Sequence, residues 1–208
     1  MRRVTTMVIA VLGVSIAAPS LAWGPYTRAG WVVGVAYGPG QAKITGADSL
    51  ETGWLQGPAQ TIRVGRMFGP RIKMGYEHQA WLREQGFQSL KIRAGTQLEA
   101  LAVTAYLGRP SSAWGGLFFT AGGGYAHCRL TFLEPLAPGE SPIGDTFEVV
   151  FLQDEFGWGG FVGAGYEFQI SRSFAAGVVL SYNHLGIGGS IYDTADFVPL
   201  TANLNWSF

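Results

Sequence analysis

Few side chains in this sequence have the type and spacing that catalysis needs. The chain contains three histidines and a single cysteine, Cys128. Glu77 and His78 are neighbours, but successive residues of a strand point to opposite faces, so these two side chains cannot act at one site. Cys128 has no second cysteine for an internal disulfide, and we interpret it as a small side chain in a strand. We therefore predict that the protein is not an enzyme and that it has no cofactor and no metal site.

Glycines at positions 160, 163 and 165 form a second tempting pattern. A glycine-rich phosphate-binding loop must connect a strand to a helix, whereas these glycines lie within a segment that alternates like a strand.

The formal net charge is zero, with 14 basic and 14 acidic residues, so nothing in the composition predicts attraction to nucleic acid. Charged residues make up 13% of the chain, about half the usual quarter, which is too few to coat a soluble surface.

The other polar side chains are positioned by strands, in which successive side chains point to two opposite faces. In residues 198–208 the even positions are apolar and the odd positions are mostly polar, which is the period of a strand. Similar alternation predicts seven further strands, at residues 29–38, 60–68, 71–81, 89–107, 113–128, 156–169 and 173–184. In residues 89–107 the apolar positions change from even to odd, so we predict a β-bulge near Glu99 and Ala100. Arg66 interrupts an apolar face and is expected to snorkel at an interface or to mark another bulge.

The N-terminus carries an export signal. Two arginines precede an apolar run of about a dozen residues, and the small residues Ser20 and Ala22 flank Leu21 at the expected cleavage point. We predict a signal peptide in residues 1–22, removed after Ala22, and a single domain in residues 23–208. No later run of 18 apolar residues follows, so the sequence predicts no transmembrane helix.

The connections and the polar faces together indicate a membrane barrel. Long connections at 39–59, 83–88, 129–155 and 185–196 alternate with short ones near 69, 108 and 170, as expected when one end of a barrel has tight turns and the other has loops. We predict an all-β fold, an eight-stranded antiparallel up-and-down transmembrane β-barrel. Charged and polar side chains on the inward faces would plug its lumen, and this predicted cluster comprises Arg63, Lys73, Glu77, Lys91, Arg93, Glu99 and Glu167.

A strand that ends the chain with Leu204, Trp206 and Phe208 on one face resembles the C-terminal assembly signal of outer-membrane barrels. The predicted domain resembles the small barrels of the OmpA and OmpX type over essentially its whole length. The resemblance implies localisation in a Gram-negative outer membrane and contact with the barrel assembly machinery. It also implies contact with membrane lipid and lipopolysaccharide, with no nucleic acid partner, and we expect a monomer. His127 and Arg129 could contact lipopolysaccharide phosphates, but we favour their interpretation as solvated rim residues.

Barrel enzymes that deacylate lipid A offer a rival resemblance. Their His-x-Ser-Asn motif corresponds here to His184, Leu185, Gly186 and Ile187, which lacks the serine nucleophile and the asparagine. We therefore expect a structural or surface-interaction role. The alternatives are a narrow channel for small solutes and, disfavoured, a lipid A-modifying enzyme. A soluble lipocalin-like carrier would instead require large apolar residues on the inward faces.

Overall fold

The computed structural model describes residues 28, 30–46, 48, 51–87, 90–108, 112, 114–135 and 147–208. The predicted signal peptide, residues 1–22, lies outside these ranges. The described residues form eight strands and contain no helix that could cross a membrane. The strands are β1 (Trp31–Gly46), β2 (Leu55–Phe68), β3 (Ile72–Phe87), β4 (Leu90–Tyr106), β5 (Leu117–Pro135), β6 (Phe147–Gln169), β7 (Phe174–Gly186) and β8 (Tyr192–Ser207).

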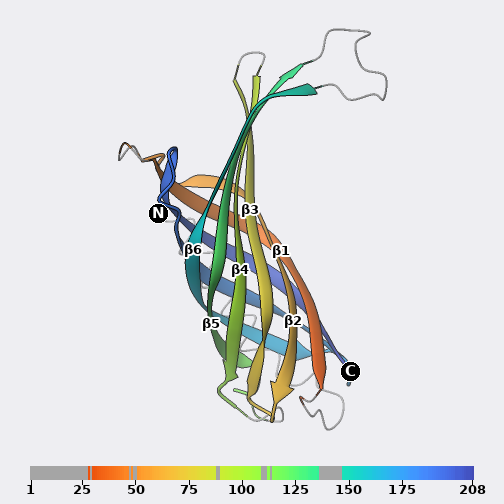
Figure 1. The fold of residues 1–208 in the computed structure, drawn as a ribbon. Coiled ribbons are helices and arrows are strands. Elements are labelled where there is room, and N and C mark those ends of the chain that lie inside the picture. Colours follow the sequence, from red (N-terminus) through yellow and green to blue (C-terminus); the bar gives the residue numbers. More distant parts are fainter. Residues whose placement is uncertain are drawn as a thin grey trace.

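Each strand pairs antiparallel with the next, and β8 pairs with β1, so the sheet closes into a barrel (Figure 1). The closing strands are joined up to the end of the chain, because the Trp31 amide donates to the Phe208 carbonyl over 2.9 Å and the Phe208 amide donates back over 3.0 Å. Closure leaves no sheet edge within the barrel wall. The predicted fold class, an eight-stranded antiparallel barrel, is confirmed.

Side chains alternate between the outside and the lumen along each strand. On β1, Trp31, Val33 and Val35 are exposed, whereas Val32 and Ala36 are buried. Outward positions carry large apolar side chains in all eight strands, and exposure reaches 76% for Leu101. The outward face of β8 has no charged residue after Asp196, and that of β6 has none after Asp154. We call this surface the apolar belt; an outer surface of this kind suits the acyl chains of a bilayer.

The strands extend further than the sequence predicts at one end of the barrel. Residues 39–59 were expected to be a loop, but β1 and β2 remain paired as far as Ala42 and Leu55. Pro39 and Pro58 led to the prediction of a loop, but they lie in paired strands and face each other across β1 and β2. Proline removes a backbone donor, and the pairing of β1 with β8 is interrupted beside Pro39. Closure of the barrel outweighs the local preference for a loop.

The expected alternation of long and short connections is only partly present. The predicted loop at 83–88 is a tight hairpin, because Phe87 pairs with Leu90. The connection between β4 and β5, expected to be short, spans 107–116 at the opposite end. That end also has the turns at 69–71 and 170–173 and the C-terminus (Figure 1). We call it the turn end, and we call the other end the hairpin end.

The bulge predicted in β4 does not exist. The pairing of β4 with β3 and with β5 is continuous through Glu99 and Ala100. Register shifts occur instead beside Gly46, between β1 and β8, and beside Leu133, between β5 and β6. Even-numbered residues of β4 therefore face the lumen throughout the barrel.

Four strands continue beyond the barrel at the hairpin end. β2 stops pairing with β3 at Trp81, and β7 stops pairing with β6 at Trp158. Beyond these points β3 to β6 remain paired with one another and rise as a narrow twisted sheet (Figure 1). We call this element, residues 82–87, 90–95, 129–135 and 147–154, the external sheet.

Candidate functional site: a filled lumen below an external sheet

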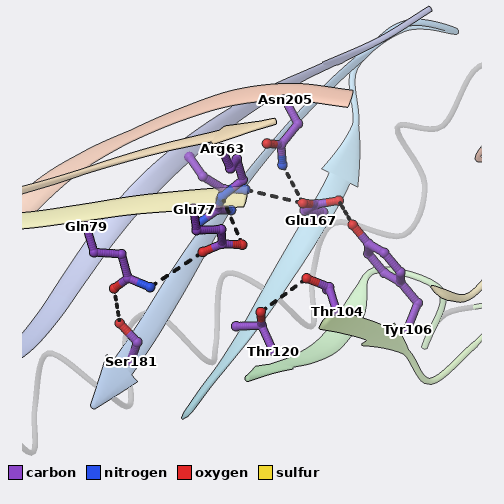
Figure 2. Close-up of polar contacts among 10 residues, drawn as sticks. Arg63, Glu77, Gln79, Thr104, Tyr106, Thr120, Glu167, Ser181 and Asn205 are labelled. Carbon is purple, nitrogen blue, oxygen red and sulfur yellow. Dashed lines mark hydrogen bonds and ion pairs between the residues drawn. The ribbon is translucent and has the colours of Figure 1, made fainter. Parts of the chain in front are cut away.

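Polar side chains fill the half of the lumen nearer the turn end. Arg63 on β2 and Glu77 on β3 are cross-strand neighbours, and the Arg63 Nε atom lies 3.6 Å from the Glu77 Oε1 atom. Both side chains are almost fully buried. Gln79 donates from Nε2 to Glu77 over 3.5 Å and accepts from the Ser181 hydroxyl over 3.4 Å (Figure 2). Buried charges are costly without partners, so these contacts hold the side chains in place.

Glu167 on β6 is the second buried acceptor. Its carboxylate accepts a hydrogen bond from the Tyr106 hydroxyl over 2.9 Å, another from Asn203 over 3.4 Å, and a third from Asn205 (Figure 2). Thr104 donates to Thr120 across the same half of the lumen over 3.1 Å. We call this group the polar half of the lumen.

The cations of the polar half come from three parts of the chain. Lys73 on β3 is 5% exposed and interacts electrostatically with Glu77 and Glu167. Arg28 precedes β1, lies over the Tyr106 ring at 3.7 Å from its centroid and donates to the carbonyl of Gly115. The space lined by Arg63, Lys73 and Glu77 cannot hold a water molecule. The polar half is thus filled by its own side chains.

Sequence reasoning missed several members of this network. Asn203 and Asn205 lie on the polar face of the last strand, so alternation alone could have identified them. Tyr106 was not named, although the predicted outward positions 101, 103 and 105 already implied that even-numbered residues in this part of the strand face the lumen. Nothing in the sequence indicated Arg28, which lies outside the alternating segments.

Three predicted lumen residues lie elsewhere. Glu99 faces outward, where its carboxylate accepts from the Tyr76 hydroxyl and lies 2.6 Å from Nδ1 of His78. Lys91 and Arg93 share its face of β4 and belong to the external sheet, where Arg93 donates from Nε to Glu84 over 2.8 Å. The prediction that these three face inward was wrong because it assumed the bulge. Arg66 is exposed beside Phe68 at the turn end with continuous pairing, so no bulge explains it.

The other half of the lumen is mainly apolar, although Thr96 and Asn183 are also fully buried there. Trp81, Leu98, Phe161, Leu185 and Phe197 are all at most 4% exposed and belong to one packed cluster. Alanines from five strands complete it, together with Cys128, Ile44, Ile187 and Tyr192. We call this group the apolar half of the lumen. It explains the change of phase in β4, since apolar residues face inward here and face lipid nearer the turn end.

A carboxylate closes the lumen at the hairpin end. Glu155 on β6 accepts hydrogen bonds from the amides of Ser190 and Ile191 and from the Ser190 hydroxyl over 2.7 to 2.8 Å, and from the Tyr192 amide over 2.7 Å. This residue lies beyond the apolar belt. Burial opposes its charged form, but the hydrogen bonds from Ser190, Tyr192 and Ile191 outweigh burial and lower the pKa of Glu155 to about 2. Through these hydrogen bonds the carboxylate holds the β7–β8 connection over the apolar half of the lumen.

His184, the residue compared with the deacylase motif, lies on the outer face. Its Nδ1 atom is 2.7 Å from Oδ1 of Asp196, and the Tyr182 hydroxyl donates to the same oxygen over 2.7 Å. A histidine held by a carboxylate suits a general base, but residue 186, two positions further on the same face, is glycine. Among the described residues, no group of three histidine, cysteine or carboxylate side chains could hold a metal ion. The absence of enzymatic activity stays a prediction.

The apolar side chains of the terminal strand lie on the outside. Leu204, Trp206 and Phe208 are 47%, 52% and 65% exposed, and the Trp206 and Phe208 rings contact each other at 5.5 Å between centroids. They form part of the apolar belt at the turn end. Their role as an assembly signal stays a prediction.

Comparison with known proteins identifies the fold through structure and not through sequence. No protein-family model matches the sequence, and no curated protein matches it. Ail, the attachment invasion locus protein of Yersinia pestis, solved in complex with the heparin analogue sucrose octasulfate, is similar with a TM-score of 0.53 and 11% identity, covering 85% of this chain and 99% of Ail. A second Ail structure has a TM-score of 0.50, again with 11% identity, covering 86% of this chain and 99% of Ail.

Neisserial surface protein A is also similar, with a TM-score of 0.48 and 12% identity, covering 86% of this chain and 97% of that protein. The closed barrel and its apolar belt fit localisation in the outer membrane. That the turn end faces the periplasm and the hairpin end the outside stays an expectation. The chain has the fold of the small eight-stranded β-barrels of the Gram-negative outer membrane.

Proposed function

We propose that this protein is a surface-interaction barrel, in which a filled barrel anchors the external sheet for contact with a macromolecular partner. The observation that carries the proposal is the continuation of β3 to β6 beyond the barrel as a paired, four-stranded sheet. Membrane anchoring needs the barrel only as far as the apolar belt. The additional length of four strands requires another reason, and contact outside the membrane supplies one.

The external sheet has features of a binding element. Beyond Trp81 the outer side of β3 is not paired with β2, and before Trp158 the outer side of β6 is not paired with β7. Unpaired strand edges can bind an extended segment of another protein through main-chain hydrogen bonds. Leu152 on β6 is 51% exposed and could take a side chain of that segment.

A channel for small solutes has less support. Side chains fill the polar half and the apolar half, and the Glu155 contacts fasten the β7–β8 connection over the hairpin end. A solute would have to displace both groups.

Sucrose octasulfate, bound by Ail, is a reasonable first probe for the arginines of the external sheet, Arg93 and Arg129.

The experiment compares the whole barrel with a variant in which 84–91 and 131–152 are replaced by short turns. We expect both proteins to show heat-modifiable gel mobility and to leave liposomes impermeable to small sugars. Cells displaying the whole barrel should adhere to protein-coated surfaces, and cells displaying the trimmed variant should not. A control that shortens only the 47–54 connection should adhere normally. Equal adhesion by both barrels, or swelling of liposomes by the whole barrel, would overturn the proposal.

A further inference from the structure

The three histidines of the chain occur in one repeated pattern. Each follows a tyrosine by two residues, in Tyr76-Glu77-His78 on β3, Tyr125-Ala126-His127 on β5 and Tyr182-Asn183-His184 on β7. Each histidine lies within hydrogen-bond distance of a carboxylate on the following strand. We call each set a Tyr-x-His element. Three of the four hairpins that point to the outside therefore carry one.

The carboxylate partners are held in similar ways. His78 and His184 use Nδ1 to contact Glu99 and Asp196 at 2.6 and 2.7 Å. In both elements the tyrosine hydroxyl donates to the same carboxylate. The Nε2 atoms of these two imidazoles take no part in these contacts.

The element on β5 and β6 differs in one partner. His127 Nε2 lies 3.0 Å from Asp154, and Arg129 donates to Asp154 over 2.7 and 3.1 Å, taking the place of the tyrosine. This carboxylate lies beyond the apolar belt, and the hydrogen bond from Arg129 lowers its pKa below the usual range. Tyr125 stacks on Phe156 instead, with 5.6 Å between ring centroids.

All three elements lie on the outer face at the external margin of the apolar belt. Towards the turn end, the outward neighbours of the carboxylates are apolar: Leu101 after Glu99, Phe156 after Asp154 and Val198 after Asp196. Beyond the histidines and carboxylates charged side chains appear among the outward residues, with Arg129 next to His127 and with Glu84 and Arg93 further along β3 and β4. The elements therefore lie where acyl chains end and lipid headgroups begin.

The hairpin of β1 and β2 has no such element. Tyr37 is present at the corresponding place, but the residue two positions further is Pro39, which faces Pro58. Gln60, opposite Tyr37, offers a neutral amide at the same margin. This hairpin is a natural internal control.

The chemistry of the elements suits a sugar better than a phosphate. Ionised carboxylates accept hydrogen bonds from hydroxyl groups and repel anions. The free imidazole nitrogen of His184, whose side chain is 58% exposed, can accept or donate another hydrogen bond. Exposed rings such as Trp158, at 74%, provide an apolar surface for the face of a pyranose. The lipid molecules whose acyl chains cover the belt must place their headgroups against these groups.

We propose that the Tyr-x-His elements bind the saccharide headgroups of glycolipids in the outer leaflet. The carboxylates accept sugar hydroxyl groups, the imidazoles provide a second hydrogen bond, and the neighbouring aromatic rings contact the sugar. This binding would orient the barrel and its external sheet at the lipid surface, whatever the sheet itself contacts.

The test measures lipid preference with three probes. The barrel is reconstituted in vesicles that contain a neutral galactolipid, rough lipopolysaccharide or phosphatidylglycerol, and the lipid that remains bound after mild detergent extraction is counted by native mass spectrometry. We expect the wild type to retain the galactolipid and lipopolysaccharide in preference to phosphatidylglycerol. In the Glu99→Gln/Asp196→Asn variant the ratio of retained glycolipid to retained phosphatidylglycerol should fall about tenfold, because each substitution removes a charge-assisted acceptor.

The controls keep the outcome decisive. Gln60→Ala, at the margin of the hairpin without an element, should behave as wild type. If the double variant does not fold, His184→Gln replaces an exposed side chain and should lower the preference on its own. Retention of lipopolysaccharide and phosphatidylglycerol without galactolipid would show recognition of phosphate and overturn the proposal. An unchanged preference in the folded variants would overturn it too.

Discussion

Side chains fill the two halves of the lumen by different physical means. In the polar half, Glu77 and Glu167 depend on particular partners, since each buried charge is stable only while its opposite charge or donor stays in place. In the apolar half, Trp81 and Leu98 depend on close packing and require no particular partner. The comparison shows that a membrane barrel need not have a uniformly polar interior. The two halves should therefore respond differently to substitution.

The largest expected effect is in the polar half. Glu77→Ala would leave Arg63 buried without its neighbouring carboxylate, and we expect a loss of about 3–5 kcal/mol in the free energy of unfolding. Urea unfolding in lipid vesicles, followed by tryptophan fluorescence, measures this. The Arg63→Met/Glu77→Leu double variant removes both charges and should recover most of the stability. If Glu77→Ala is as stable as the double variant, the ion pair does not determine the stability of this half.

In the apolar half the expected effect is set by the cavity. Leu98→Ala should cost about 2–4 kcal/mol, because the side chain is fully buried and its neighbours can close the space only in part. Leu101→Ala is the matched control: it removes the same atoms three residues along the same strand but faces lipid, which can fill the space. The same unfolding assay should separate the two variants. Equal losses would mean that the apolar half is loosely packed.

A smaller effect is expected where Glu155 fastens the β7–β8 connection over the apolar half. Glu155→Gln should cost about 1–3 kcal/mol, because charge-assisted hydrogen bonds become neutral ones. Hydrogen exchange at the amides of Ser190, Ile191 and Tyr192 should become faster, with little change in β3 and β4.

The same carboxylate gives a dependence on pH with a defined sign. Its pKa is about 2 in the folded protein, below the ordinary glutamate value of 4.5, so its stabilisation is fully present above about pH 4.5 and is lost as the pH falls through about 2. After correction for the intrinsic exchange rate, exchange at Ser190 to Tyr192 should accelerate over that range in the wild type. The Glu155→Gln variant should show no such change, and a parallel change in the variant would mean that another group titrates.

Alternation predicted much of this structure, and its errors about which residues face the lumen have one source. The eight strands, the outward face of β8 and the burial of Arg63 and Glu77 follow from a period of two, because local backbone geometry fixes it. The reasoning went wrong where it took apolar side chains always to face lipid. Leu98 is apolar and faces inward, and this reversed the expected positions of Lys91, Arg93 and Glu99.

Alternation and composition thus predicted an eight-stranded barrel, because the strand period and the low content of charged residues can be read from the sequence itself. Only the closed structure decided what each face meets, because a side chain's surroundings depend on how far the neighbouring strands extend. Pairing beyond Trp81 and Trp158 is a long-range property of four strands, and no local pattern could reveal the external sheet. The Tyr-x-His elements likewise acquire their carboxylates only through register between strands, which sequence spacing does not determine.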